Sequence, residues 1–167
     1  MTLTSRSKIS FDTLVIIAAL IIADKLIEKV IRSELAPDGT KKFIPGLLQL
    51  HYLENSGAAF GSMSGKTVFL SALTAVIFIA GLYMMLAGKI KDNVIYWSAA
   101  CIIAGGAGNF IGRVSDGYVV DYFEFTFVNF AVFNFADILI TVGAAVLVLR
   151  TLFTADRNGK KDNEQSV

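Results

Sequence analysis

Two aspartates stand out in a chain that is otherwise strongly apolar. Asp121 follows Val119 and Val120, and Asp137 opens a long apolar run that ends near Phe153. An ionised carboxylate in or near hydrocarbon is costly, so such a group normally faces a cavity, pairs with a partner or takes part in chemistry. Two neighbouring carboxylates share one proton: the ionised one can activate water, and the protonated one can polarise a carbonyl and protonate a leaving amine. The sequence alone does not bring the two side chains together.

The composition is that of a membrane protein. Of the 167 residues, 54% are hydrophobic and 17% are charged, whereas about 25% are charged in soluble domains. The length predicts one domain over residues 1–167. The net charge of +1 indicates no nucleic-acid partner. Because Cys101 and His51 are each the sole residue of their type, we expect no disulfide framework, no metal site and no cofactor.

Four apolar segments predict the fold class: an all-α membrane protein with four transmembrane helices. Each segment approaches the roughly 20 residues needed to cross ~30 Å of hydrocarbon. A helix satisfies every backbone group within such a segment. We expect the tail from about residue 156 to be disordered. The predicted helices cover residues 11–31, 67–86, 94–111 and 135–153.

The distribution of lysine and arginine predicts the orientation in the membrane. The short turn between the second and third segments carries Lys89 and Lys91, and both chain ends are also basic. By the positive-inside rule both termini are cytoplasmic. We therefore predict a multi-pass membrane protein with both chain ends on the cytoplasmic side.

With this orientation, polar residues from several segments collect at the outer membrane boundary. Asn109 and Arg113 lie four residues apart, hence on one face of the third helix. Asp24 falls in the outer half of the first helix, and Asn55 lies in an outer loop. Residues 41–54 and 119–133 partly alternate between apolar and polar side chains, which favours short strands. We therefore predict a small extracytoplasmic β element beside the site.

Four sequence blocks resemble those of the signal peptidase II (lipoprotein signal peptidase) family. They are Asn55–Phe60 (NSGAAF), Ala104–Arg113 (AGGAGNFIGR), Gly117–Asp121 (GYVVD) and Phe133–Asp137 (FNFAD). The resemblance implies a bacterial aspartyl endopeptidase that cleaves prolipoproteins just before a diacylglyceryl-modified cysteine, with its active site at the outer face of the membrane. It implies membrane lipid and lipidated signal peptides as partners, and we expect a monomer.

The resemblance also implies the site residues. It makes Asp121 and Asp137 the catalytic pair. It implies a supporting or substrate-binding role for Asn55, Gly57, Asn109, Arg113, Asn134 and Asp24.

The chain departs from the family pattern at three places, one of which is Ile138, where the family often has serine after the second aspartate. The family usually has an aspartate directly before the arginine of the second block, where this chain has Gly112. The first helix of the family usually has a lysine four residues after its aspartate. Here Glu28 holds that position and Lys29 follows it.

Other interpretations of these residues remain open from the residues alone. Asp137 could be an ordinary helix N-terminal aspartate, and Asp24 could simply pair with Lys25 or Arg113. The alternative function is a four-helix transporter or proton-relay subunit, although a relay would distribute its acidic groups through the depth of the membrane. A non-catalytic lipid-binding protein is a further alternative, and it would tolerate Asp121→Asn.

Overall fold

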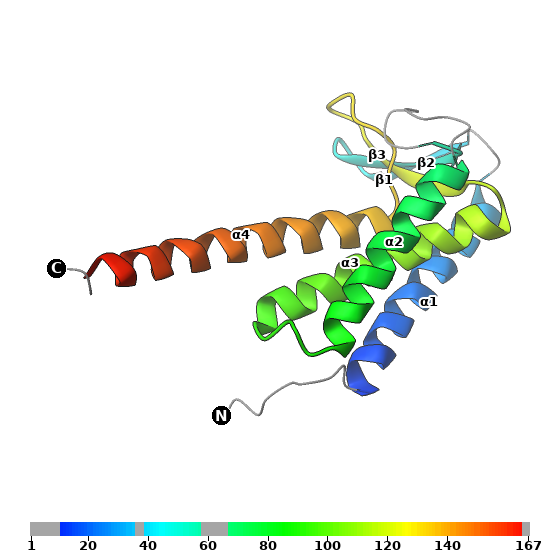
Figure 1. Ribbon diagram of the computed structural model, residues 1–167. Helices are drawn as coiled ribbons and strands as arrows, with labels where there is room; N and C mark the ends of the chain where they lie inside the picture. The colour runs from blue at the N-terminus through cyan, green and yellow to red at the C-terminus, as the bar shows by residue number, and fades with distance from the viewer. Residues whose placement is uncertain (1–10, 36–38, 58–66, 165–167) are drawn as a thin grey trace.

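The computed structural model describes residues 11–35, 39–57 and 67–164, without the side chains of residues 67, 68, 70, 71 and 155–164. Four helices and a three-stranded antiparallel sheet make up the described chain (Figure 1). The helices are α1 (Phe11–Glu34), α2 (Thr67–Leu86), α3 (Asn93–Ser115) and α4 (Phe135–Glu164). The strands are β1 (Thr40–Ile44), β2 (Leu48–Asn55) and β3 (Val119–Phe125). The predicted four helices and the predicted β element are both present.

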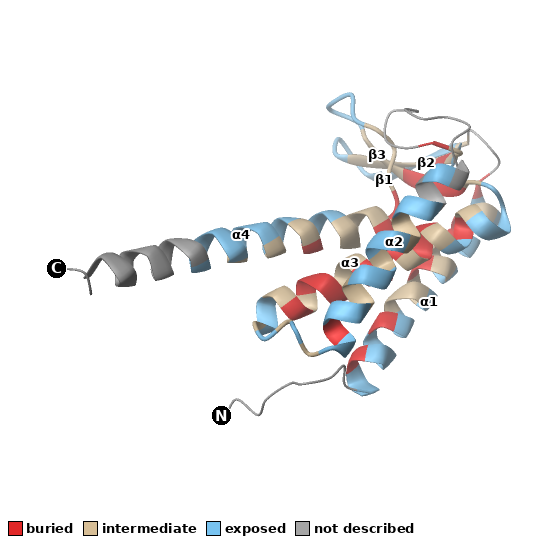
Figure 2. Ribbon diagram, in the orientation of Figure 1, coloured by how far each residue is buried: buried red, intermediate tan, exposed pale blue. Residues whose placement is uncertain are grey.

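Two helices of the described chain are long and apolar enough to cross a membrane, α3 and the Phe135–Thr154 part of α4. Ala72–Leu86 in α2 is a shorter apolar helix, and α1 carries several charges in its second half. Large apolar side chains are exposed along the helices, among them Ile79 and Leu152. Exposed residues recur along α2 and α4 (Figure 2). Surface of this kind is typical of contact with lipid.

The sheet lies across one end of the helices, beside the start of α4 (Figure 1). Its strand order is β1-β2-β3, and in β3 Asp121 pairs with Leu53 of β2. The turn from α3 into β3 contains Gly117, whose φ of 83° suits glycine because an L side chain is strained there. This turn directs the chain from the end of α3 into the strand that carries Asp121.

Helix α3 lies at the centre and packs against α1, α2 and α4. One buried apolar cluster joins it to the others through Ile17, Met85 and Ile103. Inside this cluster, Tyr96 donates a hydrogen bond to Thr13 Oγ1 at 3.0 Å. A second cluster lies under the sheet and contains Ile31, Leu35, Tyr52, Val120 and Tyr122.

Helix boundaries differ from the sequence prediction mainly at the ends. The bounds of α2 match, but α1 and α3 run on to Glu34 and Ser115, because the charged residues there do not break a helix.

Asp92 caps the start of α3, accepting from Val94 N–H at 2.9 Å, and it pairs with Arg150 at 2.8 Å. These contacts hold the pKa of Asp92 below its usual range.

The tail from about residue 156, for which the sequence predicts disorder, includes residues 156–164 of α4. The backbone of α4 continues as helix to Glu164. No proline follows Phe135, and the charged residues of this segment are compatible with helix. Residues 165–167, the basic N-terminal residues Arg6 and Lys8, and residues 58–60 of the first block lie outside the described residues.

Candidate active site

Five of the predicted site residues line one cavity of about 500 Å³. It lies where α3, α4 and the sheet meet. The wall opposite the polar residues is apolar and includes Phe125, Phe130 and Ile140. These five site residues are Asn55, Asn109, Arg113, Asp121 and Asp137, and Thr141 is a further polar side chain on the lining. The structure therefore brings together residues from β2, α3, β3 and α4.

Asp137 is held by a reciprocal cap at the start of α4. The side-chain oxygen of Asn134 accepts the backbone N–H of Asp137 at 2.8 Å, and Asp137 Oδ2 accepts the backbone N–H of Asn134 at 3.2 Å. This exchange satisfies backbone donors that a helix start leaves free. Asp137 Oδ1 accepts from Asn109 Nδ2 at 2.8 Å. Asp137 is thus a helix N-terminal aspartate, as the first of the alternative interpretations expected. It also lines the cavity.

Asp121 is held by two asparagine amides. Its Oδ2 accepts from Asn55 Nδ2 at 2.8 Å, and its Oδ1 accepts from Asn134 Nδ2 at 2.9 Å. The residue is only 2% exposed. Burial, and next the nearby charge of Asp137, raise the pKa of Asp121 to about 7 against the opposing effect of these hydrogen bonds. A carboxyl group with this pKa carries a proton through much of the neutral range.

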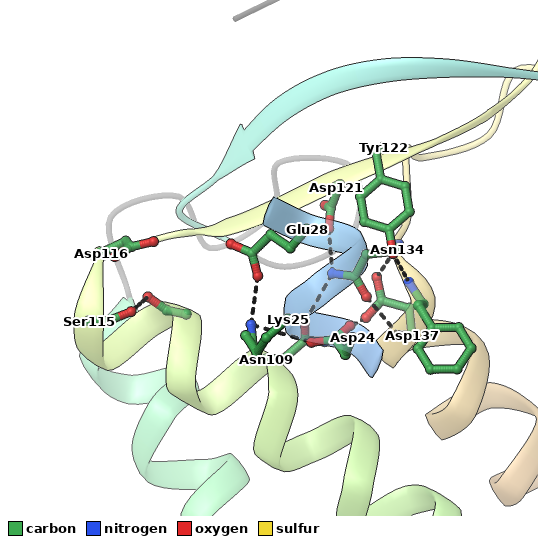
Figure 3. A network of polar contacts seen from close by, with 12 residues as sticks. Asp24, Lys25, Glu28, Asn109, Ser115, Asp116, Asp121, Tyr122, Asn134 and Asp137 are labelled. Carbon is green, nitrogen blue, oxygen red and sulfur yellow. Dashed lines mark hydrogen bonds and ion pairs between the residues drawn. The ribbon is translucent and has the colours of Figure 1, made fainter. Parts of the chain in front are cut away.

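Asn134 connects the two aspartates. Its Nδ2 lies within hydrogen-bond distance of Asp121 Oδ1 and, at 3.0 Å, of Asn109 Oδ1 (Figure 3). Its Oδ1 accepts from the backbone of Asp137. A single buried amide therefore contacts Asp121 through its nitrogen and the backbone of Asp137 through its oxygen, which links the positions of the two residues.

Arg113 is partly buried beside both aspartates, and its hydrogen-bonding groups are incompletely satisfied. Its Nη2 donates to the carbonyl oxygen of Gly57 at 3.4 Å. Within the described part of the chain, no hydrogen-bond partner is found for its Nε. Both Asp121 and Asp137 act electrostatically on the guanidinium. A buried donor of this kind is suited to a peptide carbonyl that enters the cavity.

Asp24 does not line the cavity but packs behind it. Its carboxylate lies against Gly108 of α3, where a Cβ would come within 2.6 Å of Oδ2. It accepts a backbone hydrogen bond from Ala136 and pairs with Lys25 at 3.3 Å. Of the two partners weighed for Asp24, Lys25 is therefore the one in contact. Lys29 is exposed, so the position after Glu28 does not supply a cation to Asp24.

Sequence reasoning missed the role of Tyr122. Its hydroxyl accepts the backbone N–H of Phe135 at 3.0 Å, which adds a cap to the start of α4. The signal available was its place directly after Asp121 in a strand, which turns it to the opposite face. The sequence also gave no sign that Phe125 and Phe130 would form the apolar wall.

The site contains carboxylates, amides and one guanidinium. In the described ranges, no group of three or more His, Cys, Asp or Glu side chains could hold a metal ion. The Nδ1 of His51, the sole histidine, lies 3.0 Å from Glu124 Oε2. The polar groups on the cavity can activate a water molecule, transfer protons and bind a carbonyl, and its apolar wall suits a hydrophobic substrate.

Comparison with known proteins gives a consistent result. A family model described as signal peptidase (SPase) II matches residues 16–153. A lipoprotein signal peptidase of Lactococcus lactis subsp. cremoris is 41% identical over 140 residues, covering 84% of this chain and 93% of the relative. A lipoprotein signal peptidase of Streptococcus pneumoniae is 38% identical over 141 residues, covering 83% and 90%.

Two solved structures, both described as bacterial membrane enzymes determined by the in meso method, share the fold. The one at 2.3 Å resolution has a TM-score of 0.85 and 26% identity, covering 92% of this chain and 95% of its own. The one at 1.9 Å resolution has a TM-score of 0.80 and 27% identity, covering 89% and 97%.

Proposed function

Given that this chain belongs to the signal peptidase II family of aspartic peptidases, which remove signal peptides from prolipoproteins, we propose that Asp121 and Asp137 are its catalytic pair. The observation that carries the proposal is the bridge through Asn134, which hydrogen-bonds to Asp121 and caps the helix turn that holds Asp137. Both carboxylates line the same cavity. Because the chain belongs to a family of peptidases, we no longer consider the alternative function of a transporter or proton-relay subunit.

In the proposed mechanism Asp121 carries the shared proton and Asp137 is ionised. The raised pKa of Asp121, about 7, supports this assignment. Asp137 takes a proton from water as the water oxygen attacks the scissile carbonyl, while Asp121 gives its proton to the carbonyl oxygen. As the C–N bond breaks, Asp137 gives its proton to the leaving nitrogen and Asp121 takes back a proton from the collapsing diol. The products are a signal peptide with a free carboxylate and a lipoprotein with a new N-terminal amine.

Around this pair we assign the remaining predicted residues to support and substrate binding. Asn55, Asn109 and Asn134 hold the carboxylates. Arg113, together with the Gly57 carbonyl that it contacts, binds the polar backbone of the substrate. Asp24 supports the start of α4 from behind.

The substrate we propose is a prolipoprotein cleaved just before a diacylglyceryl-modified cysteine. The apolar wall of the cavity, formed in part by Phe125, Phe130 and Ile140, supports a lipid-bearing residue as the occupant. One copy of the chain contains both aspartates and the cavity, which supports a monomer as the active unit. No metal or cofactor enters the mechanism.

We further propose that residues 1–167 form one domain whose four helices cross the bacterial cytoplasmic membrane. The end of the molecule that carries the sheet and the aspartates faces outward, and both termini are cytoplasmic. Lys89 and Lys91 lie in the turn between α2 and α3 and support this orientation by the positive-inside rule.

The decisive experiment compares two peptides of the same sequence around a lipoprotein cleavage site. One carries a diacylglyceryl group on the cysteine and the other does not. Purified full-length protein in detergent is expected to cut the lipidated peptide on the N-terminal side of the cysteine and to leave the other intact. Equal cleavage of both peptides would contradict the proposed substrate class.

A further inference from the structure

A line of alternating charges runs along α1 on the side of the helix that faces the site. We call Asp24, Lys25, Glu28 and Arg32 the α1 charge network. Glu28 is its centre: Oε2 accepts from Lys25 Nζ at 2.7 Å, and Oε1 accepts from Arg32 Nη2 at 2.7 Å and from Arg32 Nε at 3.1 Å. Glu28 is 8% exposed. A buried carboxylate is costly unless it is paired and hydrogen-bonded in this way.

One arm of the network reaches the start of α4. Lys25 Nζ, besides its bond to Glu28, lies 3.3 Å from Asp24 Oδ2 (Figure 3). Asp24 in turn accepts a backbone hydrogen bond from Ala136, the residue directly before Asp137. The Asp24 carboxylate can approach this closely because Gly108 leaves the space open. This arm therefore ends next to the proposed general base.

The other arm reaches the turn that leads into β3. Arg32 Nη1 donates to the hydroxyl of Tyr118 at 3.0 Å, and its guanidinium lies 5.2 Å from the centre of the Tyr118 ring. Arg32 also forms an ion pair with Asp116. Asp116 and Tyr118 flank Gly117, and the strand that begins at Val119 carries Asp121. This arm therefore ends just before the proposed proton donor.

We propose that Glu28 is a positioning residue of the aspartate pair. Resting on the function proposed above, it holds the two arms together, so that α1 sets the position of β3 relative to the start of α4. Glu28 does not line the cavity. Loss of its charge would therefore shift the two carboxylates relative to one another without removing a group that contacts the substrate.

The test measures kcat and KM of full-length Glu28→Gln for the lipidated peptide in detergent, below the melting temperature of every variant. Glu34→Gln is the matched control: it makes the same chemical change on the same helix, at an exposed carboxylate 3.3 Å from Lys41. We expect Glu28→Gln to lower kcat by about tenfold or more with KM changed less than about threefold, because misplacement acts on chemistry rather than on binding. The control is expected to match the parent.

A parent-like kcat in Glu28→Gln, or a loss confined to KM, would overturn the proposal. Tyr118→Phe provides an independent measurement if Glu28→Gln does not fold, since it removes only the hydroxyl that accepts from Arg32. We expect a severalfold loss of kcat with KM unchanged, and an unchanged kcat in this variant also overturns the proposal.

The double variant separates a network from two unrelated defects. Because Glu28 and Tyr118 are joined through Arg32, the losses of kcat in Glu28→Gln and Tyr118→Phe should be less than multiplicative when combined. Fully multiplicative losses would contradict one connected network. Failure of the proposed function would appear differently, as cleavage that persists in Asp121→Asn whatever Glu28→Gln does.

Discussion

The side-chain amide of Asn134, the residue directly before α4, donates to Asp121 Oδ1 of β3 at 2.9 Å. Asn134 is also the residue that caps α4. The cap of the helix that carries one aspartate therefore reaches directly to the other. Local helix capping and the geometry of the site are coupled through one side chain.

This coupling allows the two roles of Asn134 to be separated by mutation. Asn134→Ala removes both the cap and the bond to Asp121, so stability should fall by about 1 kcal/mol and kcat by roughly 10–100-fold. Asn134→Ser keeps a good cap but is too short to reach Asp121. We expect Asn134→Ser to recover the melting temperature and not the turnover. Recovery of both in the serine variant would show that Asn134 acts only as a cap.

The sequence predicted much of this site because the blocks that carry it are local. The bounds of α2 followed directly from an apolar run, and alternation indicated the strands that flank Asp121. The cap around Asp137 is contained within four consecutive residues. Such features depend on neighbours along the chain and can be anticipated from it.

Contacts between distant segments could not be predicted in the same way. Arg32 and Tyr118 are far apart in the sequence, and their contact depends on how α1 packs against the turn before β3. The sequence suggested Lys25 as one possible partner of Asp24, but nothing local distinguished it from Arg113. Burial of Glu28 likewise follows from packing, because a glutamate on a helix is exposed by default.

The central prediction concerns the two aspartates. Asp121→Asn and Asp137→Asn should each lower turnover of the lipidated peptide by several orders of magnitude while the protein stays folded, because both members of the pair must act. The double variant should be no worse than either single variant, since residues that act as a unit are not additive.

Glu124→Gln is a suitable control for these variants. Glu124 lies on the same strand as Asp121 but contacts Gln49 and His51. It should retain turnover close to that of the parent. Substantial residual cleavage in either aspartate variant, measured by mass spectrometry of the products, would remove that residue from the mechanism.

The raised pKa of Asp121 also predicts how stability depends on pH. Its folded-state pKa of about 7 lies above the ordinary value of 3.8, so between these values the folded state binds more protons than the unfolded state. Stability should therefore fall as pH rises through this window, by on the order of a few kcal/mol. Asp121→Asn has no charge to bury at this position. The melting temperature of this variant should therefore rise relative to that of the parent as the pH increases from 5 to 8.

Thermal melts of parent, Asp121→Asn and the surface variant Glu34→Gln in one detergent would measure this gain. Glu34 is exposed and its removal should leave the pH dependence of the parent unchanged. A constant difference between Asp121→Asn and the parent across the pH range would mean that Asp121 is ionised throughout it.

The proposed orientation predicts which positions are accessible from outside the cell. In a Cys101→Ala background, a cysteine at Asn129 should react with an impermeant thiol reagent in intact spheroplasts, and one at Asn93 should not. Both positions are exposed in the structure, so burial does not explain a difference. After the membrane is permeabilised, both should react. The opposite pattern in intact spheroplasts would invert the orientation and move the site to the cytoplasmic face.

A substitution at Arg113 tests whether this partly buried cation binds the substrate or stabilises the fold. Its one hydrogen bond in the described chain is the 3.4 Å contact to Gly57, and its Nε is unsatisfied. Removing a group with so few partners should cost little stability, whereas removing it from beside the reacting carbonyl should cost much turnover. We therefore expect Arg113→Ala to melt within a few degrees of the parent and to lose about 100-fold or more in kcat/KM.

Arg113→Lys is the matched variant, because it keeps the positive charge beside Asp121 and Asp137 but loses the planar fork of donors. It should melt like the parent and recover only part of the lost turnover. The measurement pairs thermal melts with cleavage of the lipidated peptide at low temperature for both variants. If Arg113→Ala melts far below the parent yet cuts normally in the cold, Arg113 is structural, and substrate binding must then rest on the asparagines and the apolar wall.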